Sequence, residues 1–387
     1  MIKKASNKNK TDISSKKQNI VFFLPGYGDP PIGGYKIVYE YANRLSENGF
    51  DVHIMYPHLK YIPELKPFAD KKNKILIIKL LKYIKFTAKK LLGKVKAAEW
   101  FDLNPSVKKD FYFEINSRTI KKYDKDSIFI ATAIQTAYIL AKCNLPRSRA
   151  FYFIQDFEAW FGLSEEQVLN SYRFNLNKIA IAPWLCEKVA SVGETATLIP
   201  NGFDFEYFKL SNPIENRKSS NVLMLYHLDD RKRCVDSLAA LEKVKKVIPD
   251  LHVDMFGTPE KPENLPEYID YYQRPDRELH NKLYNDAAIF VAASKAEGMA
   301  LPPAEAMICG AALCCTNIGG FALYAKNNET ALTSPVYDID KLAANIIALI
   351  QNDDLRIKIA KSGNEFIKQF TWEKAVQSFI DYIKQCS

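Results

Sequence analysis

Short runs of apolar residues recur along the chain, and segments with helical periodicity alternate with them. Such runs cover residues 19–24, 52–56, 128–134 and 150–156, and again 221–226, 251–256, 288–293 and 314–317. Continuous apolar runs of this length are typical of strands buried on both faces of a parallel sheet. Between the first two runs, Ile37, Val38, Tyr41, Ala42 and Leu45 lie on one face of a predicted helix. The pattern therefore predicts βαβ units and an α/β fold.

The alternation stops at a polar, proline-containing stretch and then restarts, which predicts two domains. A chain of 387 residues is also too long for one hydrophobic core. We expect two Rossmann-like, parallel-sheet domains that face a central cleft, where a ligand would bind. The predicted divisions are a disordered tail (1–18), a first domain (19–203), a linker (204–220), a second domain (221–370) and a C-terminal helix (371–387) that packs back on the first domain.

Composition narrows the class of protein. The seven cysteines contain no C-x-x-C pair, so we expect reduced thiols and no zinc site. No run of eighteen apolar residues exists, and no apolar segment precedes Ile20, so neither a membrane span nor a secretory signal is expected. These features predict a cytoplasmic protein. The lysine-rich segment described next would place it at the inner face of the membrane.

The net charge of +9 is concentrated in one segment, Lys71 to Lys96, which contains ten lysines and no acid. Its apolar residues fall within about 120° of a helical wheel. One interpretation is a basic amphipathic helix on an anionic membrane surface. The other is a domain helix that packs by its apolar stripe and leaves its lysines in solvent. Because this segment supplies the whole net charge, a nucleic-acid-binding surface spread over the fold is not expected.

The stretch from Glu297 to Glu305 joins a predicted strand to a predicted helix that starts at about Pro303. Backbone N–H groups of such a loop and the helix dipole point at an anion. Gly33-Gly34 opens a helix in the first half but is not a G-x-G-x-x-G motif, so a dinucleotide cofactor is not expected. Gln155, Asp156 and Glu158 follow a strand at the carboxyl edge of the first sheet, where α/β proteins bind ligands.

The motif Glu297-Gly-Met-x-Leu-Pro-x-x-Glu305-Ala-Met-x-x-Gly310, followed by Thr316-x-x-Gly-Gly320, resembles the family-4 retaining glycosyltransferases of the GT-B fold. The Gly33-Gly34 loop, Pro200-Asn-Gly-x-Asp204, Lys232 and Phe256-Gly257 occur in the order of that family, so the resemblance covers the chain from about residue 19. The segments 131–137 and 152–158 look like the rhamnosyltransferase branch that builds bacterial surface polysaccharides.

The resemblance implies a role for each matched residue. Glu305 would bind the ribose, Glu297 the transferred sugar, and Lys232 the diphosphate. The remaining donor-binding residues would be Gly33, Gly34, Gly257, Gly298, Met299, Ala300 and Leu301. Tyr226 stands where the family usually has an arginine, and Arg231 or Arg233 would replace that guanidinium. We expect Glu297, Asp156 and Lys232 to be catalytic, with Asp156 orienting the acceptor or assisting its deprotonation.

The expected reaction moves a sugar, rhamnose from dTDP-rhamnose, to a glycan or lipid-linked glycan acceptor. The nucleotide sugar is a substrate, and neither a cofactor nor a divalent metal is expected. The alternatives are a UDP- or GDP-hexose glycosyltransferase, a sugar-nucleotide epimerase, a catalytically idle scaffold in a polysaccharide assembly complex, and a basic membrane-binding protein.

Overall fold

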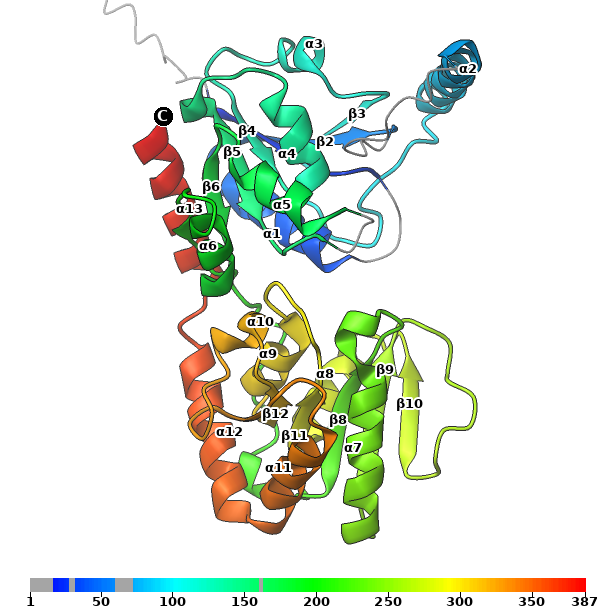
Figure 1. Cartoon of the computed structure of the whole chain (residues 1–387), viewed down its shortest axis with the longest axis vertical. Coiled ribbons are helices and arrows are strands. Elements are labelled where there is room, and N and C mark those ends of the chain that lie inside the picture. Colours follow the sequence, from blue (N-terminus) through cyan, green and yellow to red (C-terminus); the bar gives the residue numbers. More distant parts are fainter. Residues whose placement is uncertain (1–16, 28–31, 60–71, 160–162) are drawn as a thin grey trace, which may run out of the picture.

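The computed structural model describes residues 17–27, 32–59, 72–159 and 163–387. Most of the tail predicted over 1–18 therefore lies outside the described residues. The described residues form two α/β halves, each a sheet with helices packed on it. Figure 1 shows the first sheet above and the second below. Each sheet is parallel, as the apolar runs predict.

The first sheet has seven strands in the order β3-β2-β1-β4-β5-β6-β7, all pairs parallel. Its strands are β1 (Asn19–Phe23), β2 (Asp51–Pro57), β3 (Lys108–Tyr112), β4 (Ile128–Ala131), β5 (Ala150–Ile154), β6 (Asn177–Ala180) and β7 (Thr197–Leu198). The helices of this half are α1 (Gly33–Glu47), α2 (Lys72–Leu91), α3 (Ser117–Ile120), α4 (Ile134–Ala141), α5 (Glu165–Tyr172) and α6 (Pro183–Ala190).

The second sheet has six strands in the order β10-β9-β8-β11-β12-β13, also parallel. Its strands are β8 (Asn221–Tyr226), β9 (His252–Gly257), β10 (Ile269–Gln273), β11 (Ile289–Ala292), β12 (Ala312–Thr316) and β13 (Ala331–Ser334). The helices are α7 (Cys234–Val247), α8 (Arg277–Asp286), α9 (Leu301–Ile308), α10 (Gly319–Ala322), α11 (Ile339–Gln351), α12 (Asp353–Ile367) and α13 (Trp372–Cys386).

The carboxyl ends of both sheets meet at the junction of the two halves. Strands β1, β4 and β12 are buried along their whole length, which is the burial expected for central parallel strands covered by helices on both faces. The order of each sheet reverses beside its first strand, at β1/β4 and at β8/β11. Ligands of open α/β sheets bind at such switch points, so the fold brings two ligand-binding edges face to face.

The last helix, α13, packs on the first sheet although the preceding helices belong to the second (Figure 1). The Phe379 ring lies 6.3 Å from the ring of Phe22 and 6.0 Å from that of Phe153, and the Trp372 ring lies 5.3 Å from that of Tyr41. The chain thus crosses between the halves twice. The crossings touch, because the Phe203 N–H donates to the Phe370 carbonyl at 3.0 Å.

The stretch predicted as a linker, 204–220, packs on the second half rather than standing in solvent. Ile214 is buried. The buried Arg217 guanidinium donates to the carbonyl oxygens of Ala287 and Cys309. The exact domain bounds given above stay predictions.

Helix α2 contradicts the expectation of a domain helix packed by its apolar stripe. Leu80, Leu81, Ile84, Leu91 and Leu92 are all exposed. Figure 1 shows α2 projecting from the first half beside the edge strand β3. None of the described helices has both the length and the apolar character needed to cross a bilayer.

Candidate functional site

Residues 293–300 form the loop between β11 and α9, and we call them the donor loop. Hydrogen bonds fix its backbone: the Lys295 N–H donates to the Arg231 carbonyl at 2.8 Å, and the Tyr324 hydroxyl donates to the Ala300 carbonyl at 2.7 Å. Helix α9 begins at Leu301, not at Pro303 as predicted, because prolines fit the first turn of a helix. Those prolines lack N–H groups, so the donors available to an anion come from the loop.

The N–H groups of Gly298 and Met299 face no hydrogen-bond acceptor in the described part of the chain. Backbone donors left unpaired beside a helix N-terminus are the usual components of an anion site. These two N–H groups are therefore candidate donors to an anion, and the role that the motif predicts for them stays a prediction. Met299 and Ala300 are themselves buried, so only their backbones could contact a ligand. The predicted contact at Ala300 is not available, because its N–H donates to the Gly320 carbonyl at 3.4 Å and its carbonyl accepts from Tyr324.

Glu297 is a buried carboxylate at the centre of the loop. Both its oxygens accept hydrogen bonds from the Lys232 ammonium, at 2.7 and 2.8 Å, and one accepts from the Ser294 hydroxyl at 2.8 Å. The structure thus brings Glu297 and Lys232 together, 65 residues apart in sequence. The pair is charged, mostly buried and directly at the carboxyl ends of β8 and β11.

Arg231 links the two halves of the molecule. Its guanidinium pairs with Asp229 at 2.7 Å and with Asp156, which follows β5 of the first sheet, at 3.2 Å. Burial raises the pKa of Asp156 to about 6, even though the Arg231 guanidinium acts to lower it. Asp156 therefore stands in the cleft as a carboxyl group that titrates near neutral pH.

Arg233 is not brought into this group. Its backbone is left-handed, with φ of 47°, and its guanidinium pairs with Asp230 at 2.7 Å and Asp236 at 2.8 Å. It also lies over the Tyr337 ring, 5.2 Å from the centroid. Of the two arginines considered for the missing family guanidinium, Arg231 is the one that reaches the cleft.

Glu305 lies on α9 and is also buried. Its carboxylate accepts from the Tyr284 hydroxyl at 3.0 Å and lies 4.0 Å from the Lys36 ammonium, which comes from α1 of the first half. Burial raises the pKa of Glu305, while Lys36 and Tyr284 oppose that rise. A buried acid with a free lone pair beside a lysine is suited to accept hydrogen bonds from ligand hydroxyls.

The predicted glycines serve different purposes. Among the residues that the structure describes, a Cβ atom on Gly33 would meet nothing within 4 Å, and one on Gly34 would make ordinary contact with the Gln155 side chain at 3.6 Å. A Cβ on Gly298 would lie 1.9 Å from the Gln155 carbonyl oxygen, and one on Gly257 would lie 2.3 Å from the Tyr226 carbonyl oxygen. Protein packing alone requires glycine at 257 and 298, whereas the space at Gly33 is open to a ligand.

The loop after β5 contributes a second acid, Glu158. Its carboxylate accepts a hydrogen bond from the Ile134 N–H at the start of α4. Burial, with a smaller contribution from the neighbouring Asp156 charge, raises the pKa of Glu158 to about 8, although the Ile134 hydrogen bond opposes the rise. The side chain is therefore largely neutral at pH 7, a state in which it also donates a hydrogen bond.

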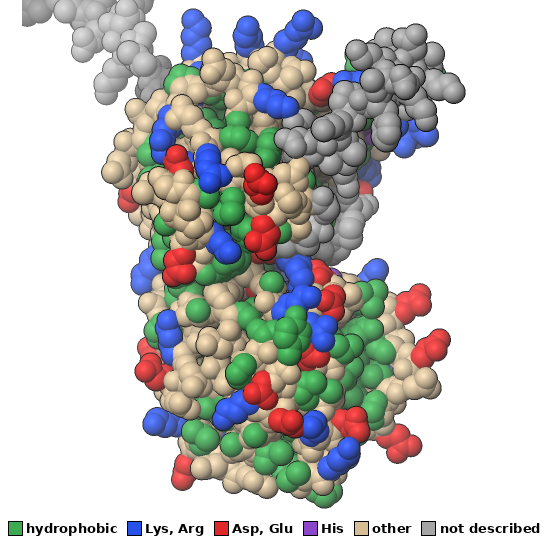
Figure 2. Space-filling model, viewed as in Figure 1, with side chains coloured by type: hydrophobic (Ala, Val, Ile, Leu, Met, Phe, Trp, Pro, Cys, Tyr) green, Lys and Arg blue, Asp and Glu red, His purple; other side chains and the backbone are tan. Residues whose placement is uncertain are grey.

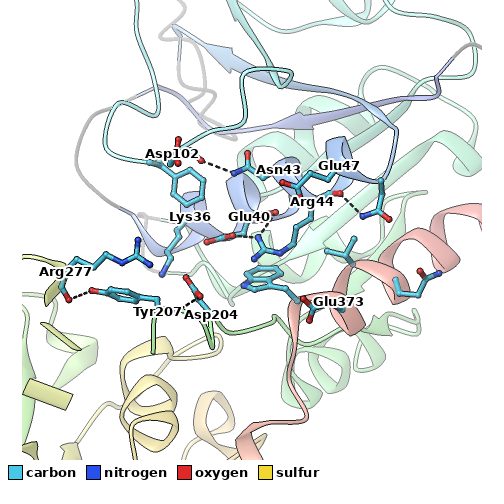
Figure 3. Close-up of a pocket in the computed structure, with 15 residues that line it drawn as sticks. Lys36, Glu40, Asn43, Arg44, Glu47, Asp102, Asp204, Tyr207, Arg277 and Glu373 are labelled. Carbon is cyan, nitrogen blue, oxygen red and sulfur yellow. Dashed lines mark hydrogen bonds and ion pairs between the residues drawn. The ribbon is translucent and has the colours of Figure 1, made fainter. Parts of the chain in front are cut away.

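A cavity of about 880 Å³ opens at the junction of the halves, beside α1, α13 and the start of α8 (Figure 3). Lys36 lines it and also faces Glu305, so the cavity adjoins the site. Across it, the Arg277 guanidinium lies 4.2 Å from the centroid of the Tyr207 ring. Figure 2 shows basic and acidic side chains mixed along this junction. A site with charges of both signs suits a ligand that carries an anion and hydroxyl groups.

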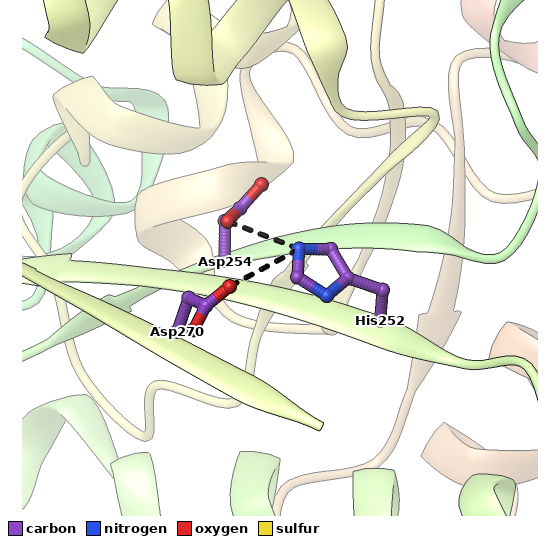
Figure 4. A group of neighbouring side chains, drawn as sticks. All are labelled: His252, Asp254 and Asp270. Carbon is purple, nitrogen blue, oxygen red and sulfur yellow. Dashed lines mark hydrogen bonds and ion pairs between the residues drawn. The ribbon is translucent and has the colours of Figure 1, made fainter. Parts of the chain in front are cut away.

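One group of metal-ligand type occurs among the described residues, but it lies away from the cleft. His252 Nε2 is 3.3 Å from an Asp254 oxygen and 3.8 Å from an Asp270 oxygen (Figure 4). His252 and Asp254 stand at the beginning of β9, whereas the cleft lies beyond its carboxyl end. Both carboxylates share one imidazole nitrogen, which is the arrangement of an ordinary histidine–aspartate ion pair.

Sequence reasoning missed several residues that contact the site. Ser294 stands three residues before Glu297, and Lys36 follows the Gly33-Gly34 pair, so their spacing carried a signal. Tyr284 and Trp184 carried none. The Trp184 indole N–H donates to the Gly298 carbonyl across the junction at 3.0 Å, and only the fold places it there.

Part of the chain is similar in sequence to known glycosyltransferases. Residues 209–366 match the family model of glycosyl transferases group 1. The chain is 24% identical over 195 residues to a phosphatidyl-myo-inositol mannosyltransferase of Mycolicibacterium smegmatis, covering 48% of this chain and 50% of the relative. It is 33% identical over 117 residues to the O-antigen chain mannosyltransferase B of Escherichia coli, covering 30% and 29%. The chain therefore spans about half, or less, of the length of these curated relatives.

Solved structures resemble the whole chain. Anabaena HepE, in complex with UDP and glucose, superposes with a TM-score of 0.68 at 15% identity, covering 95% of this chain and 100% of HepE. TarM of S. aureus superposes with a TM-score of 0.66 at 13% identity, covering 95% and 99%. At such identities the likeness shows the fold. We conclude that the whole chain has the GT-B fold and that residues 209–366 are similar to the glycosyl transferases group 1 family.

Proposed function

We propose that this protein transfers a glycosyl group from a nucleoside diphosphate sugar to an acceptor hydroxyl. The observation that carries the proposal is the convergence of Lys232, Glu297, Arg231 and Asp156 at the facing sheet edges, beside the donor loop. Two cations and two unpaired loop N–H groups fit a diphosphate, and the two carboxylates fit a sugar and its acceptor. The group 1 match over 209–366 and the GT-B fold support the same reading.

In this proposal each end of the donor has its own residues. Glu305 accepts hydrogen bonds from the ribose hydroxyls, next to Tyr284 and Lys36. The nucleoside lies toward the cavity of Figure 3, and the diphosphate lies against Lys232, Arg231 and the donor loop. Glu297 holds the transferred sugar. Gly33 and Gly34 approach the donor from the first half, where no side chain in the described part of the chain occupies the space above Gly33.

The barrier to transfer is charge separation. The bond between C1 of the sugar and the phosphate oxygen breaks, an oxocarbenium-like centre forms, and negative charge grows on the diphosphate. Lys232, Arg231 and the N–H groups of Gly298 and Met299 would stabilise that charge in a site partly closed to water. We propose that these fixed charges do the work of a divalent metal.

The acceptor oxygen forms the new bond to C1 and loses its proton. We propose, following the resemblance to the family-4 enzymes, that the reaction retains the configuration at C1 and that the departing phosphate oxygen takes this proton. Asp156 would orient the acceptor hydroxyl. Its position at the end of β5, in the first half and paired with Arg231 of the second half at 3.2 Å, supports this role.

The identity of the transferred sugar is the most specific part of the proposal. The sequence motifs favour rhamnose, but the relatives matched here are named as mannosyltransferases. GDP-mannose therefore becomes the first donor to test, ahead of UDP-hexoses and dTDP-rhamnose. The names of those relatives also support a glycolipid or O-antigen-type glycan as the acceptor. We further propose that the reaction occurs in the cytoplasm, since all seven cysteines are free thiols.

A thermal-shift screen of the full chain against GDP-mannose, UDP-glucose and dTDP-rhamnose tests the proposal, because a ligand stabilises the state that binds it. We expect one nucleotide to raise the melting temperature, with or without EDTA. Glu305→Ala and Lys232→Ala should lower the affinity for that nucleotide. Asp156→Ala should leave the affinity unchanged but lower the rate of transfer. Lys243→Ala, on the outer face of α7, is the matched control.

Two outcomes would overturn the proposal. Absence of any shift with every nucleotide sugar would contradict a donor site and favour the idle scaffold. Equal binding by the Glu305, Lys232 and Lys243 variants would contradict the site assignment. Loss of binding in EDTA, restored by Mg²⁺ or Mn²⁺, would contradict metal independence alone.

A further inference from the structure

Helix α2 is attached to the first half by a narrow contact. Phe86 is its one buried side chain among the described residues, and the Phe86 ring lies 5.0 Å from that of His58 and 5.9 Å from that of Phe113. The Lys79 ammonium pairs with Glu114 at 2.7 Å, and the Lys90 ammonium donates to the Phe111 carbonyl at 2.7 Å. Phe86, Lys79 and Lys90 therefore define the side of α2 that faces the protein.

The apolar stripe lies on the opposite side of the helix. At about 100° per residue, Leu80, Ile84 and Leu91 fall roughly 120–160° from Phe86, and Leu81 falls about 140° away on the other flank. Their exposed fractions are 57%, 55%, 83% and 60%. Leu92, just past the helix, is 67% exposed. A face of leucine and isoleucine turned wholly outward is costly in water and marks an interaction surface.

The charges around the stripe have one sign. Nine lysines and no acid occur between residues 72 and 98. Lys82, Lys85 and Lys89 lie between the protein-facing side and the apolar stripe, are exposed, and have no ion-pair partner among the described residues. Long lysine side chains in this position bring their ammonium groups toward the headgroup region while the leucines enter the acyl layer.

We propose that α2 lies on an anionic lipid bilayer, with the stripe of Leu80, Leu81, Ile84 and Leu91 inserted below the headgroups. Two features select this partner over another protein. A second copy of the chain would bring two sets of lysines together, which like-charge repulsion opposes. A bilayer also accepts a helix about 30 Å long without a shaped groove, and its phosphates complement every lysine along it.

This placement has a consequence for catalysis, which rests on the proposed function, whereas bilayer binding itself does not. Helix α2 leaves the first half, the side that supplies Asp156 and Gly33-Gly34. A protein held by α2 therefore presents its acceptor side to the membrane. The acceptor class that fits is a sugar or polyol carried on a lipid anchor.

Vesicle sedimentation of the full chain tests the proposal. We expect strong binding to vesicles of phosphatidylglycerol and phosphatidylcholine in equal parts, and much weaker binding to phosphatidylcholine alone. Lys85→Gln/Lys89→Gln should lower the partition coefficient by roughly fivefold per lysine. Leu80→Gln/Leu91→Gln should lower it by about tenfold or more per residue, because insertion of apolar area supplies the rest of the affinity.

Matched controls lie on other surfaces. Lys374→Gln/Lys384→Gln on α13 makes the same change of net charge, and Leu198→Gln/Val247→Gln removes two other exposed apolar side chains. Both controls should bind vesicles as the unchanged protein does. All four substituted sites are exposed, so melting temperatures should agree and show that each variant folds.

Several results would overturn the proposal: no binding to anionic vesicles, equal binding to both vesicle types, or equal loss in the control variants. The protein could instead form a concentration-dependent dimer that dissociates in Leu80→Gln/Leu91→Gln and show no vesicle binding. That result would show that the stripe joins two copies of the chain. Nucleotide-sugar binding should be unchanged in the α2 variants. A failure of vesicle binding with intact donor binding would thus leave the proposed function standing.

Discussion

Glu297 and Lys232 neutralise each other in the donor-free site. The carboxylate holds the ammonium through both oxygens at 2.7 and 2.8 Å and is itself held by Ser294. An arriving diphosphate therefore competes with Glu297 for Lys232 and is repelled by the carboxylate. The two residues should consequently have opposite effects on nucleotide affinity, although the proposed mechanism uses both for transfer.

We predict that Glu297→Gln binds the free nucleoside diphosphate as tightly as the unchanged protein or a few times more tightly, while transfer falls at least a hundredfold. Glutamine keeps an acceptor for Ser294 but removes the charge. Lys232→Ala should lower the affinity for the same nucleotide by about ten- to a hundredfold, as expected for a lost hydrogen bond to a charged group. Isothermal titration measures both. Weaker binding in Glu297→Gln would contradict the competition.

Glu158 gives a prediction about pH. Burial raises its pKa to about 8, so between pH 4.5 and 8 the native state holds a proton that the unfolded chain has released. Stability should therefore fall as pH rises through this window, by at most about 1.4 kcal/mol per unit. Glu158→Gln keeps an acceptor for the Ile134 N–H and should remove this contribution.

The measurement is the urea midpoint of both proteins from pH 6 to pH 9. The difference between Glu158→Gln and the unchanged protein should widen in favour of the variant as pH rises. Parallel curves would show that Glu158 is ionised at pH 7 and that the cleft around it is wetter than its packing suggests.

At the scale of elements, the two glycine loops make a paired prediction. Gly33→Ala adds a methyl group to open space in the first turn of α1, so the melting temperature should stay the same or rise slightly. Gly298→Ala forces a methyl group to within 1.9 Å of the Gln155 carbonyl oxygen, so the donor loop or the whole second half must shift.

We expect Gly298→Ala to lower both the melting temperature and nucleotide affinity, and Gly33→Ala to lower affinity alone. Thermal shift with and without the nucleotide separates the two effects. Unchanged affinity in Gly33→Ala would mean that no ligand approaches the start of α1. Unchanged behaviour of Gly298→Ala would mean that the halves separate easily at this contact.

The sequence predicted the central strands, where apolar runs are continuous, and missed the edge strands β3, β10 and β13. Strand β13 is mostly buried, but its four residues, Ala-Leu-Thr-Ser, are too short and too polar a run to be recognised. The runs at β1 and β11 are apolar because helices cover both faces. The edge strands β3 and β10 were missed because one flank meets solvent: Lys108 and Lys109 of β3, and Asp270 and Gln273 of β10, are exposed. The apolar stripe of α2 was visible in the periodicity, but periodicity does not reveal whether anything covers it.

The candidate site was likewise predictable from the sequence only in part. Glu297, Glu305 and Lys232 follow from motif spacing, and the structure places Glu297 with Lys232. The contacts Gln155–Gly298, Trp184–Gly298 and Lys36–Glu305 join residues from different halves, so no local pattern encodes them. The sequence does not distinguish Arg231 from Arg233, whereas in the structure Arg231 pairs with Asp156 and Arg233 is held by Asp230 and Asp236.

For the whole molecule, the double crossing determines how the halves are joined. The first crossing passes Phe203 and the second passes Phe370, and the two strands are hydrogen-bonded. A Cβ on Gly202 would lie 2.4 Å from the Trp372 backbone, so the crossings are also tightly packed. Two adjacent, hydrogen-bonded crossings hold the halves together at one place on the molecule.

Since α13 completes the first half, we predict that Phe379→Ala lowers the free energy of unfolding of that half by about 3–5 kcal/mol, the usual cost of a buried phenylalanine. The tryptophans, at positions 100, 160, 184 and 372, are absent from 221–370. Tryptophan fluorescence in urea therefore follows the first half. Gln377→Ala, exposed on the same helix, should leave the midpoint unchanged. Equal effects of both substitutions would contradict a structural role of the α13 contact.

The return of α13 also fixes an order of events during synthesis. About 170 residues separate the end of the first half at Phe203 from α13, which at roughly 5–20 residues per second takes about ten to thirty seconds to translate. During that interval the aromatic surface of Phe22, Tyr41 and Phe153 has no cover. The second half, made of contiguous chain, can fold first. The half that the ribosome makes first is therefore the last to be finished, and its nascent form should depend on chaperones.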